Sequence, residues 1–84
     1  MFIELEWDQN KSASNLLKHG VSFDEAKTVF DDPDHSYNEH RYIIIGYSLK
    51  NRLLIVAYAE RKNKVRLISA REATRREQKV YEEG

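Results

Sequence analysis

The chain has no cysteine, one proline and three glycines among its 84 residues. Without cysteine there is no disulfide framework, and the Cys/His spacing of a structural zinc site is missing too. Gly-rich phosphate-binding motifs are also absent. No apolar run is long enough for a membrane-spanning helix or a secretory leader, so we expect a cytoplasmic chain with no membrane partner. A chain of this size buries only roughly 60% of its unfolded surface, which predicts one domain over residues 1–84 with a thin core.

The net charge is zero, yet the two halves of the chain carry opposite charges. Residues 1–40 hold three bases against nine acids, a net charge of −6. Residues 41–84 hold eleven bases against five acids, a net charge of +6. An anionic partner would bind the second half, although the opposite charges can also cancel across the folded surface.

Hydrophobic periodicity predicts a short strand and a helix at the start of the chain. Ile3, Leu5 and Trp7 alternate with glutamates, the pattern of a strand with one solvated face. Asp8 can cap a helix over 9–19, and Gly20 supplies the left-handed position that ends it. The side chains expected on the buried face of this helix are apolar: Ala13, Leu16 and Leu17.

A second helix is expected to begin with a capping box, in which the Ser22 hydroxyl and the Glu25 carboxylate each satisfy a backbone N–H. Apolar residues at helical spacing continue to Phe30, and Pro33 ends the helix because proline disfavours helical geometry in the preceding residue. The polar segment 34–40 is interpreted as a surface loop.

The second half of the chain predicts a three-stranded antiparallel meander followed by a helix. The strands are expected over 42–47, 53–59 and 65–69, and Ser69 is expected to cap the last helix with Glu72 at the capping-box position. The face of that helix is only thinly apolar: Ala73, Glu77, Val80 and Tyr81. The order strand, helix, helix, meander, helix makes a small single α+β domain.

Metal and nucleophilic catalysis find little support in the sequence. The only dense cluster of carboxylates and histidine runs from Asp31 to His35, and aspartates before a proline are an ordinary way to stop a helix. Ser69 with a distant histidine is a combination that any chain of this length offers. We therefore expect no metal site and no cofactor.

A run of bases on the last two strands and the last helix has a phosphate-binding composition. The planar guanidinium of arginine holds a phosphate through two hydrogen bonds, and each neutralised phosphate adds salt-sensitive affinity. Arg66 lies within a strand, where a base on the surface face meets either an acid or a ligand. Arg71 is expected at the start of the last helix, whose N–H groups favour anions. For three further bases the preferred interpretation is a solvated helix face beside glutamates: Arg75, Arg76 and Lys79.

RNA cleavage needs no metal when the neighbouring 2′-hydroxyl attacks the phosphate. It then requires a base for that hydroxyl, a proton donor for the leaving oxygen and fixed positive charge at the phosphate. Histidine titrates near neutral pH, so His19 beside Lys18 can serve as base or acid, or can instead interact with the helix dipole. His35 and His40 are interpreted as surface residues.

Many short stretches along the chain resemble one known family. In the first half they are Trp7-Asp8, Lys11, Asn15, Lys18 to Phe23, Ala26, Val29-Phe30 and Asp32-Pro33. In the second half they are Arg41, Ile45 to Tyr47, Tyr58 to Arg61, Ile68 to Arg71, Ala73, Arg76-Glu77 and Tyr81. Over nearly its whole length the chain resembles BrnT, the ribonuclease toxin of a type II toxin–antitoxin pair.

The resemblance implies a fold similar to that of RelE-type toxins and a metal-independent endoribonuclease that inhibits translation. It also implies a partner, a BrnA-like ribbon-helix-helix antitoxin, in a heterotetramer of two toxins with an antitoxin dimer. Operator DNA would be bound only through the antitoxin, which represses the shared operon. Such a partner would explain the thin apolar face of the last helix.

We therefore predict an endoribonuclease toxin that acts on an RNA substrate. Arg66 and Arg71 are predicted to bind the scissile phosphate, and Lys18 and His19 to transfer protons or supply charge. Glu60 and Arg61 are predicted to orient the site. Further RNA contacts are expected from four bases: Arg52, Lys62, Lys64 and Arg75. A noncatalytic nucleic-acid-binding or protein-interaction module would show the same basic half and stays open as the alternative.

Overall fold

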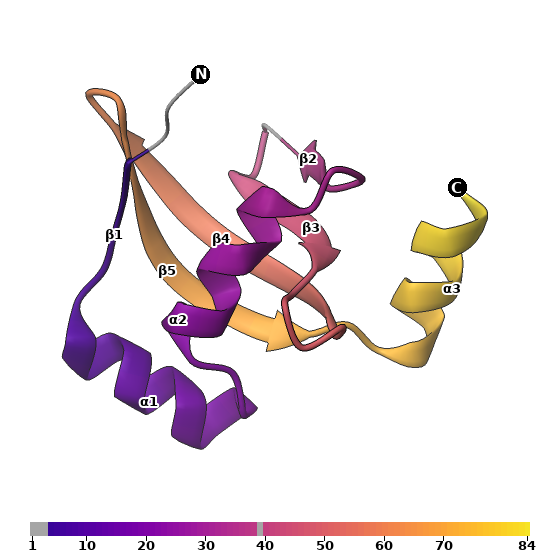
Figure 1. Ribbon diagram of the computed structural model, residues 1–84, viewed down its shortest axis with the longest axis horizontal. Coiled ribbons are helices and arrows are strands. Elements are labelled where there is room, and N and C mark those ends of the chain that lie inside the picture. Colours follow the sequence, from indigo (N-terminus) through magenta and orange to yellow (C-terminus); the bar gives the residue numbers. More distant parts are fainter. Residues whose placement is uncertain (1–3, 39) are drawn as a thin grey trace.

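The computed structural model describes residues 4–38 and 40–84, and it shows a single curved sheet with helices around it (Figure 1). The five strands are β1 (Glu4–Glu6), β2 (Ser36–Asn38), β3 (Ile43–Tyr47), β4 (Leu53–Arg61) and β5 (Lys64–Glu72). Their order in the sheet is β1-β5-β4-β3-β2, with β1 parallel to β5 and the other pairs antiparallel. The predicted antiparallel pairing of the last three strands is confirmed, and β1 and β2 extend the sheet at its two edges.

One predicted segment, 34–40, is corrected by the structure, and two predicted segments each contain a residue outside the described part of the chain. Residues 36–38 form strand β2, which pairs with β3, so the segment 34–40 is not wholly a loop. The backbone N–H and C=O groups of 36–38 form hydrogen bonds with β3, which would otherwise be an open edge of the sheet. These hydrogen bonds favour a strand despite the polar side chains of the segment. Ile3, the first residue of the predicted strand, and Glu39 of the predicted loop lie outside the described residues.

The first helix, α1 (Gln9–His19), has the ends that the sequence predicts. The Asp8 carboxylate accepts a hydrogen bond from the N–H of Asn10 at 2.7 Å, and Gly20 has φ 73° at the C-terminal end. These two residues satisfy backbone groups that the helix itself leaves unpaired.

The buried face of α1 is polar, so the predicted apolar face is wrong. Leu16 is 50% exposed, Leu17 is 90% exposed, and Ala13 is exposed as well. The buried residues are Ser12 and Asn15. The buried face of α1 contacts the rest of the domain through hydrogen bonds instead of apolar contacts. The two leucines therefore lie on the solvent side of the helix.

Asn15 is the residue that fixes α1 against the sheet. Its amide nitrogen donates to the carbonyls of Val21 at 2.8 Å and Ala70 at 2.7 Å, and its oxygen accepts from the N–H of Ala70 at 3.2 Å. A buried amide with this many partners specifies one orientation of the helix, because any other orientation would leave polar groups unpaired.

The second helical segment begins with α2 (Phe23–Ala26) and continues as the 3-10 helix η1 (Lys27–Asp31). The Ser22 hydroxyl accepts from the N–H of Glu25 at 3.1 Å, as predicted. The second half of the predicted capping box is not made. The Glu25 carboxylate points instead to Ser48 and Arg52, because a buried carboxylate gains more from a guanidinium and a hydroxyl than from one backbone N–H.

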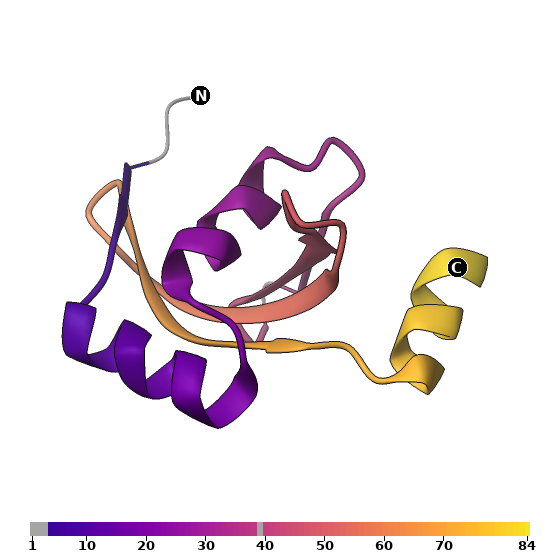
Figure 2. The same ribbon diagram turned by 60° about the horizontal axis from the view of Figure 1, so that its bottom comes forward.

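The core lies between α2, η1 and the sheet face that they cover (Figure 2). Its largest fully buried side chains come from both layers: Val21, Phe23, Val29, Ile44, Leu54, Val56 and Leu67. Side chains alternate between the two faces of a strand, so the neighbours of these core residues point to the opposite face of the sheet, which we call the outer face.

The end of the chain differs from the prediction. Strand β5 continues to Glu72, past the predicted Ser69 cap, with a bulge opposite Ala57 and Tyr58 of β4. Its main chain stays paired with β4, which prevents a helix from starting at Ser69. Helix α3 (Arg75–Glu83) starts later, capped by Thr74 in a capping box with Glu77.

Helix α3 stands apart from the other helices in both views and buries no residue (Figures 1 and 2). Polar contacts attach it to the domain. The Tyr81 hydroxyl donates to the carbonyl of Asp34 at 2.6 Å, and the Tyr47 hydroxyl donates to Glu82 at 2.6 Å. Val80 is 66% exposed, whereas Tyr81 is half-buried against the ring of Tyr47 and Ala73 precedes the helix, so only part of the predicted thin apolar face is open to solvent.

Candidate functional site

The outer face of the sheet carries the predicted bases near the β4–β5 turn. Val65 and Leu67 are buried in the core, so Lys64 and Arg66, which alternate with them, lie on the outer face. Cross-strand pairing sets Arg61 opposite Lys64. We call this group of three bases the hairpin cluster.

An acid on β1 approaches the hairpin cluster. Glu6 is the register partner of Arg66, and its Oε2 lies 3.7 Å from Arg66 Nη1. The two side chains are 39% and 38% exposed, so this ion pair is loose and open to solvent. Sequence analysis missed Glu6, because the parallel pairing of β1 with β5 cannot be read from local patterns.

Arg71 lies on the same face as Arg66 but at the other end of β5. The two arginines are five positions apart along β5, about 16 Å at the usual rise. Arg71 donates from Nη1 and Nη2 to the two carboxylate oxygens of Glu77, at 2.8 and 2.9 Å. These hydrogen bonds lower the pKa of Glu77 to about 2 and raise that of Arg71. The structure therefore brings the two arginines onto one face, each beside a different carboxylate.

Lys18 and His19 are exposed at the C-terminal end of α1. In Figure 1 this helix lies at the bottom of the molecule and the β4–β5 turn at the top left, so the two are apart. Asn15 ties α1 to Ala70, the neighbour of Arg71 in β5. The predicted site residues thus form two groups, one at the turn and one near Arg71.

Arg52 is occupied by carboxylates. Its Nε and Nη2 donate to the two oxygens of Glu25 at 3.0 and 2.5 Å, and its Nη1 lies 3.8 Å from Glu72. The hydrogen bond from Arg52 lowers the pKa of the Glu25 carboxyl, against the opposing effect of burial. Arg75, another predicted RNA contact, is the exposed first residue of α3.

The β4–β5 turn adds a further base to the hairpin end. Lys62 and Asn63 form the turn with φ 42° and 68°. Both residues are exposed, so Lys62 extends from the tip of the hairpin. Among the described residues, no carboxylate forms an ion pair with Arg61, Lys62 or Lys64. Lys18 and Arg75 are likewise without an ion pair in the described part of the chain, so the turn holds three of the five unpaired lysines and arginines of the predicted set.

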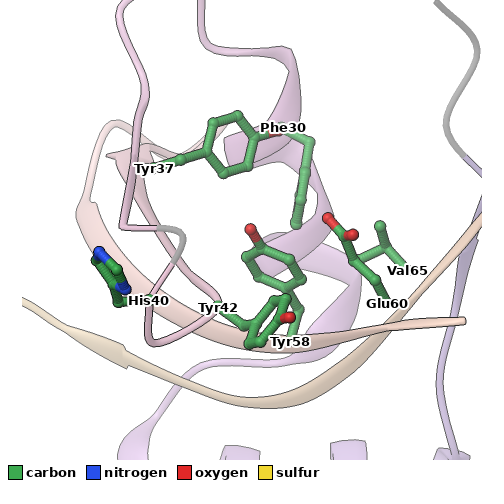
Figure 3. A pocket seen from close by; sticks show the side chains of 7 residues that line it. All are labelled: Phe30, Tyr37, His40, Tyr42, Tyr58, Glu60 and Val65. Carbon is green, nitrogen blue, oxygen red and sulfur yellow. The ribbon is translucent and has the colours of Figure 1, made fainter.

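Beside the turn, on the face that carries the core, lies an aromatic pocket of about 590 Å³ (Figure 3). Its lining residues come from η1, β2, the β2–β3 connection, β4 and β5: Phe30, Tyr37, His40, Tyr42, Tyr58, Glu60 and Val65. Figure 3 shows Phe30 and Tyr37 above Tyr42 and Tyr58, with His40 and Glu60 at opposite ends. The volume falls within the range of ligand sites, roughly 300–1,000 Å³.

Edge-to-face ring contacts order the walls of the pocket. The ring of Tyr58 lies 5.9 Å from Phe30, 6.1 Å from Tyr37 and 6.0 Å from Tyr42, with interplanar angles of 73°, 78° and 87°. Burial, and then the charge of Glu60, raise the pKa of Tyr37. Of the predicted site residues, Glu60 is the one that lines this pocket. The available signals for the pocket are Tyr37, in the segment 34–40 that the sequence predicts to be a surface loop, and Tyr42, in the strand predicted over 42–47.

The structure brings together no group of three or more histidines, aspartates or glutamates able to hold a metal ion within residues 4–38 and 40–84. In the same part of the chain no helix has the length and apolar composition needed to cross a membrane.

Among solved structures, a 1.1 Å crystal structure of the Brucella abortus ribonuclease toxin BrnT is similar, with a TM-score of 0.67 and 19% identity. The match covers 88% of this chain and 100% of that one, and it shows a shared fold. No curated protein sequence matches the chain. The family model for BrnT, the ribonuclease toxin of type II toxin–antitoxin systems, matches residues 7–77. The chain therefore belongs to the BrnT family of ribonuclease toxins.

Proposed function

We propose that the chain is an endoribonuclease toxin that cleaves RNA without a metal ion, inhibits translation in the cytoplasm and is neutralised by a ribbon-helix-helix antitoxin. The family match over residues 7–77 is the observation that carries this proposal. The proposal includes a fold similar to that of RelE-type toxins and a heterotetramer of two toxins with an antitoxin dimer. Operator DNA would be bound through the antitoxin alone.

The RNA strand binds at the hairpin end of the outer face. Phosphate binding is strongest where positive charge is not already held tightly by a protein carboxylate. Arg52 and Arg71 are paired with Glu25 and Glu77, whereas the bases of the turn have no such partner among the described residues. Arg71, with Lys18 and His19, would contact the RNA further along the strand.

The scissile phosphate lies beside Arg66. Glu6 takes the proton of the 2′-hydroxyl as its oxygen bonds to phosphorus, and Lys64 donates a proton to the 5′-oxygen as the bond to phosphorus breaks. Arg66 and Arg61 stabilise the charge that develops on the phosphate oxygens. The products are a 2′,3′-cyclic phosphate and a 5′-hydroxyl end.

The experiment is to incubate the purified chain with a defined RNA in excess EDTA and to identify the ends of the products. Continued cleavage with cyclic-phosphate ends is expected. Cleavage that stops in EDTA and returns with magnesium would refute the metal-independent mechanism. RNA that is bound and never cut would favour the noncatalytic binding module.

The salt dependence of the affinity for RNA provides a second test with the same purified chain and RNA. Affinity for RNA should fall steeply between low and physiological salt, because bound phosphates replace released counterions. An affinity that does not change over that range would rule out the hairpin cluster as the binding surface.

A further inference from the structure

We propose that the aromatic pocket binds a guanine base of the RNA substrate, next to the phosphate held by the hairpin cluster. This inference rests on the proposed ribonuclease function and adds base specificity to it. Aromatic rings suit the flat faces of a nucleobase, and base–aromatic stacking is the usual way in which proteins hold unpaired bases. Tyr37 and Tyr42 are 43% and 50% exposed, so their rings are accessible from solvent.

The tyrosine walls are held in place before any ligand arrives. Tyr42 has φ 51°, a backbone conformation that bulky residues rarely adopt. Its carbonyl accepts a hydrogen bond from the N–H of Tyr58 at 3.0 Å, which fixes this conformation at the start of β3. Strain that is kept at a pocket lining residue is typical of functional sites.

Glu60 supplies the selectivity. It lines the pocket and makes no hydrogen bond or ion pair with any other described residue. An ionised carboxylate only accepts hydrogen bonds, and it can accept two in parallel. Guanine offers two adjacent donors on its pairing edge, N1–H and the N2 amino group. Adenine, cytosine and uracil each have a single donor position on that edge, so a carboxylate cannot form the same parallel pair of hydrogen bonds with them.

The pocket and the hairpin cluster are within reach of one RNA strand. Glu60 and Arg61 are consecutive in β4, so their side chains point to opposite faces at the same position along the strand. The pairing of β3 with β4 ends at Ala57, and Tyr58 bonds to the carbonyl of Tyr42 just beyond it, so among the described residues no strand flanks Glu60 and Arg61 on the β3 side. An RNA strand can pass around this edge, with its phosphate on Arg61 and its base in the pocket.

The test uses the purified chain, guanosine 3′-monophosphate, and RNA end mapping. Calorimetry should show that guanosine 3′-monophosphate binds at least about tenfold more tightly than the adenosine, cytidine and uridine 3′-monophosphates. Mapped cleavage ends should be enriched at phosphates adjoining guanine. Glu60→Gln should abolish both preferences, because the amide presents a donor to a donor. Glu83→Gln, an exposed glutamate on α3, is the matched control.

Tyrosine variants separate stacking from folding. Tyr37→Ala should weaken guanosine 3′-monophosphate binding about tenfold, whereas Tyr37→Phe, which keeps the ring, should bind like the parent chain. Circular dichroism must first show that each variant is folded. Equal affinity for all four nucleotides, or an unchanged preference in Glu60→Gln, would overturn the proposal even if the chain cleaves RNA. Specific binding of the free nucleotide, with no guanine preference in cleavage, would overturn it too.

If the chain cleaves no RNA, the proposed function fails while the nucleotide titration still reports on the pocket. If it cleaves RNA without regard to base, the pocket assignment fails and the ribonuclease stands. The two results are therefore distinguishable.

Discussion

The ion pair between Glu25 and Arg52 should stabilise the fold strongly, and Arg52→Met tests this. The Glu25 side chain is 3% exposed and receives hydrogen bonds from Arg52 and from the Ser48 hydroxyl at 2.7 Å. Removing one partner of a buried pair costs about 3–5 kcal/mol, because a buried charge is left unpaired. Arg52 is 30% exposed, and water can replace part of its contact, so we expect a loss of about 2–3 kcal/mol.

That loss is a large part of the total stability, which is about 4–13 kcal/mol for a domain of this length. Urea unfolding followed by circular dichroism should show it, together with a drop in Tm of roughly 10–20 °C. Lys79→Met, on the exposed face of α3, is the control and should change little. The double variant Glu25→Gln/Arg52→Met should be more stable than the sum of the single losses predicts. Additive losses, or an Arg52→Met loss below about 0.5 kcal/mol, would refute the reasoning.

The same pair predicts a dependence on pH with a definite sign. The pKa of Glu25 in the folded protein lies below its ordinary value of 4.5, mainly because of the hydrogen bond from Arg52. The ionised pair therefore contributes its full stability above that ordinary value, and the contribution is lost as the pH falls through the lowered pKa. The stability difference between the parent chain and Glu25→Gln should shrink as acid is added, and a constant difference would contradict this.

Three further predictions concern other parts of the molecule. Asn15→Leu leaves backbone groups of Ala70 and Val21 unpaired, so urea unfolding should show a loss of about 2–3 kcal/mol; a loss near zero would contradict its anchoring role. Gly46→Ala sets a Cβ 3.0 Å from Asp32 Oδ2 and from His35 Cβ, so its Tm should fall by several degrees, and an unchanged Tm would show that these neighbours yield. Arg66→Ala should slow RNA cleavage about a hundredfold, since a lost contact to developing charge costs about 3 kcal/mol. Arg76→Ala should leave the rate nearly unchanged, and the opposite ranking of these two variants, both folded and bound by antitoxin, would move the site to another face.

Local signals predicted much of the fold. The ends of α1 follow from Asp8 and Gly20, whose effects are confined to neighbouring backbone groups. The pairing of β3, β4 and β5 follows from consecutive strands joined by short turns. What could not be read locally was which face of α1 is buried. That depends on Ala70, a residue far along the chain whose backbone groups bond to Asn15.

The candidate site, like the fold, could be predicted from the sequence only in part. The bases were recognisable as a phosphate-binding composition, but composition does not tell which of them already have a carboxylate partner. Arg52 and Arg71 meet Glu25 and Glu77 only after folding. The aromatic pocket likewise joins residues of η1, β2 and β4, and only the tertiary structure brings them together.

The parallel pairing of β1 with β5 has a consequence for how the toxin is made. Leu5 is paired with Val65, so β1 finds its place in the sheet only after residue 65 has been synthesised. Closing such a long loop is entropically costly, and contacts distant in sequence form slowly. Glu6 is brought to Arg66 by this same pairing. A nascent chain that has not yet reached residue 66 would therefore lack the contact between Glu6 and Arg66 on which the proposed RNA cleavage depends.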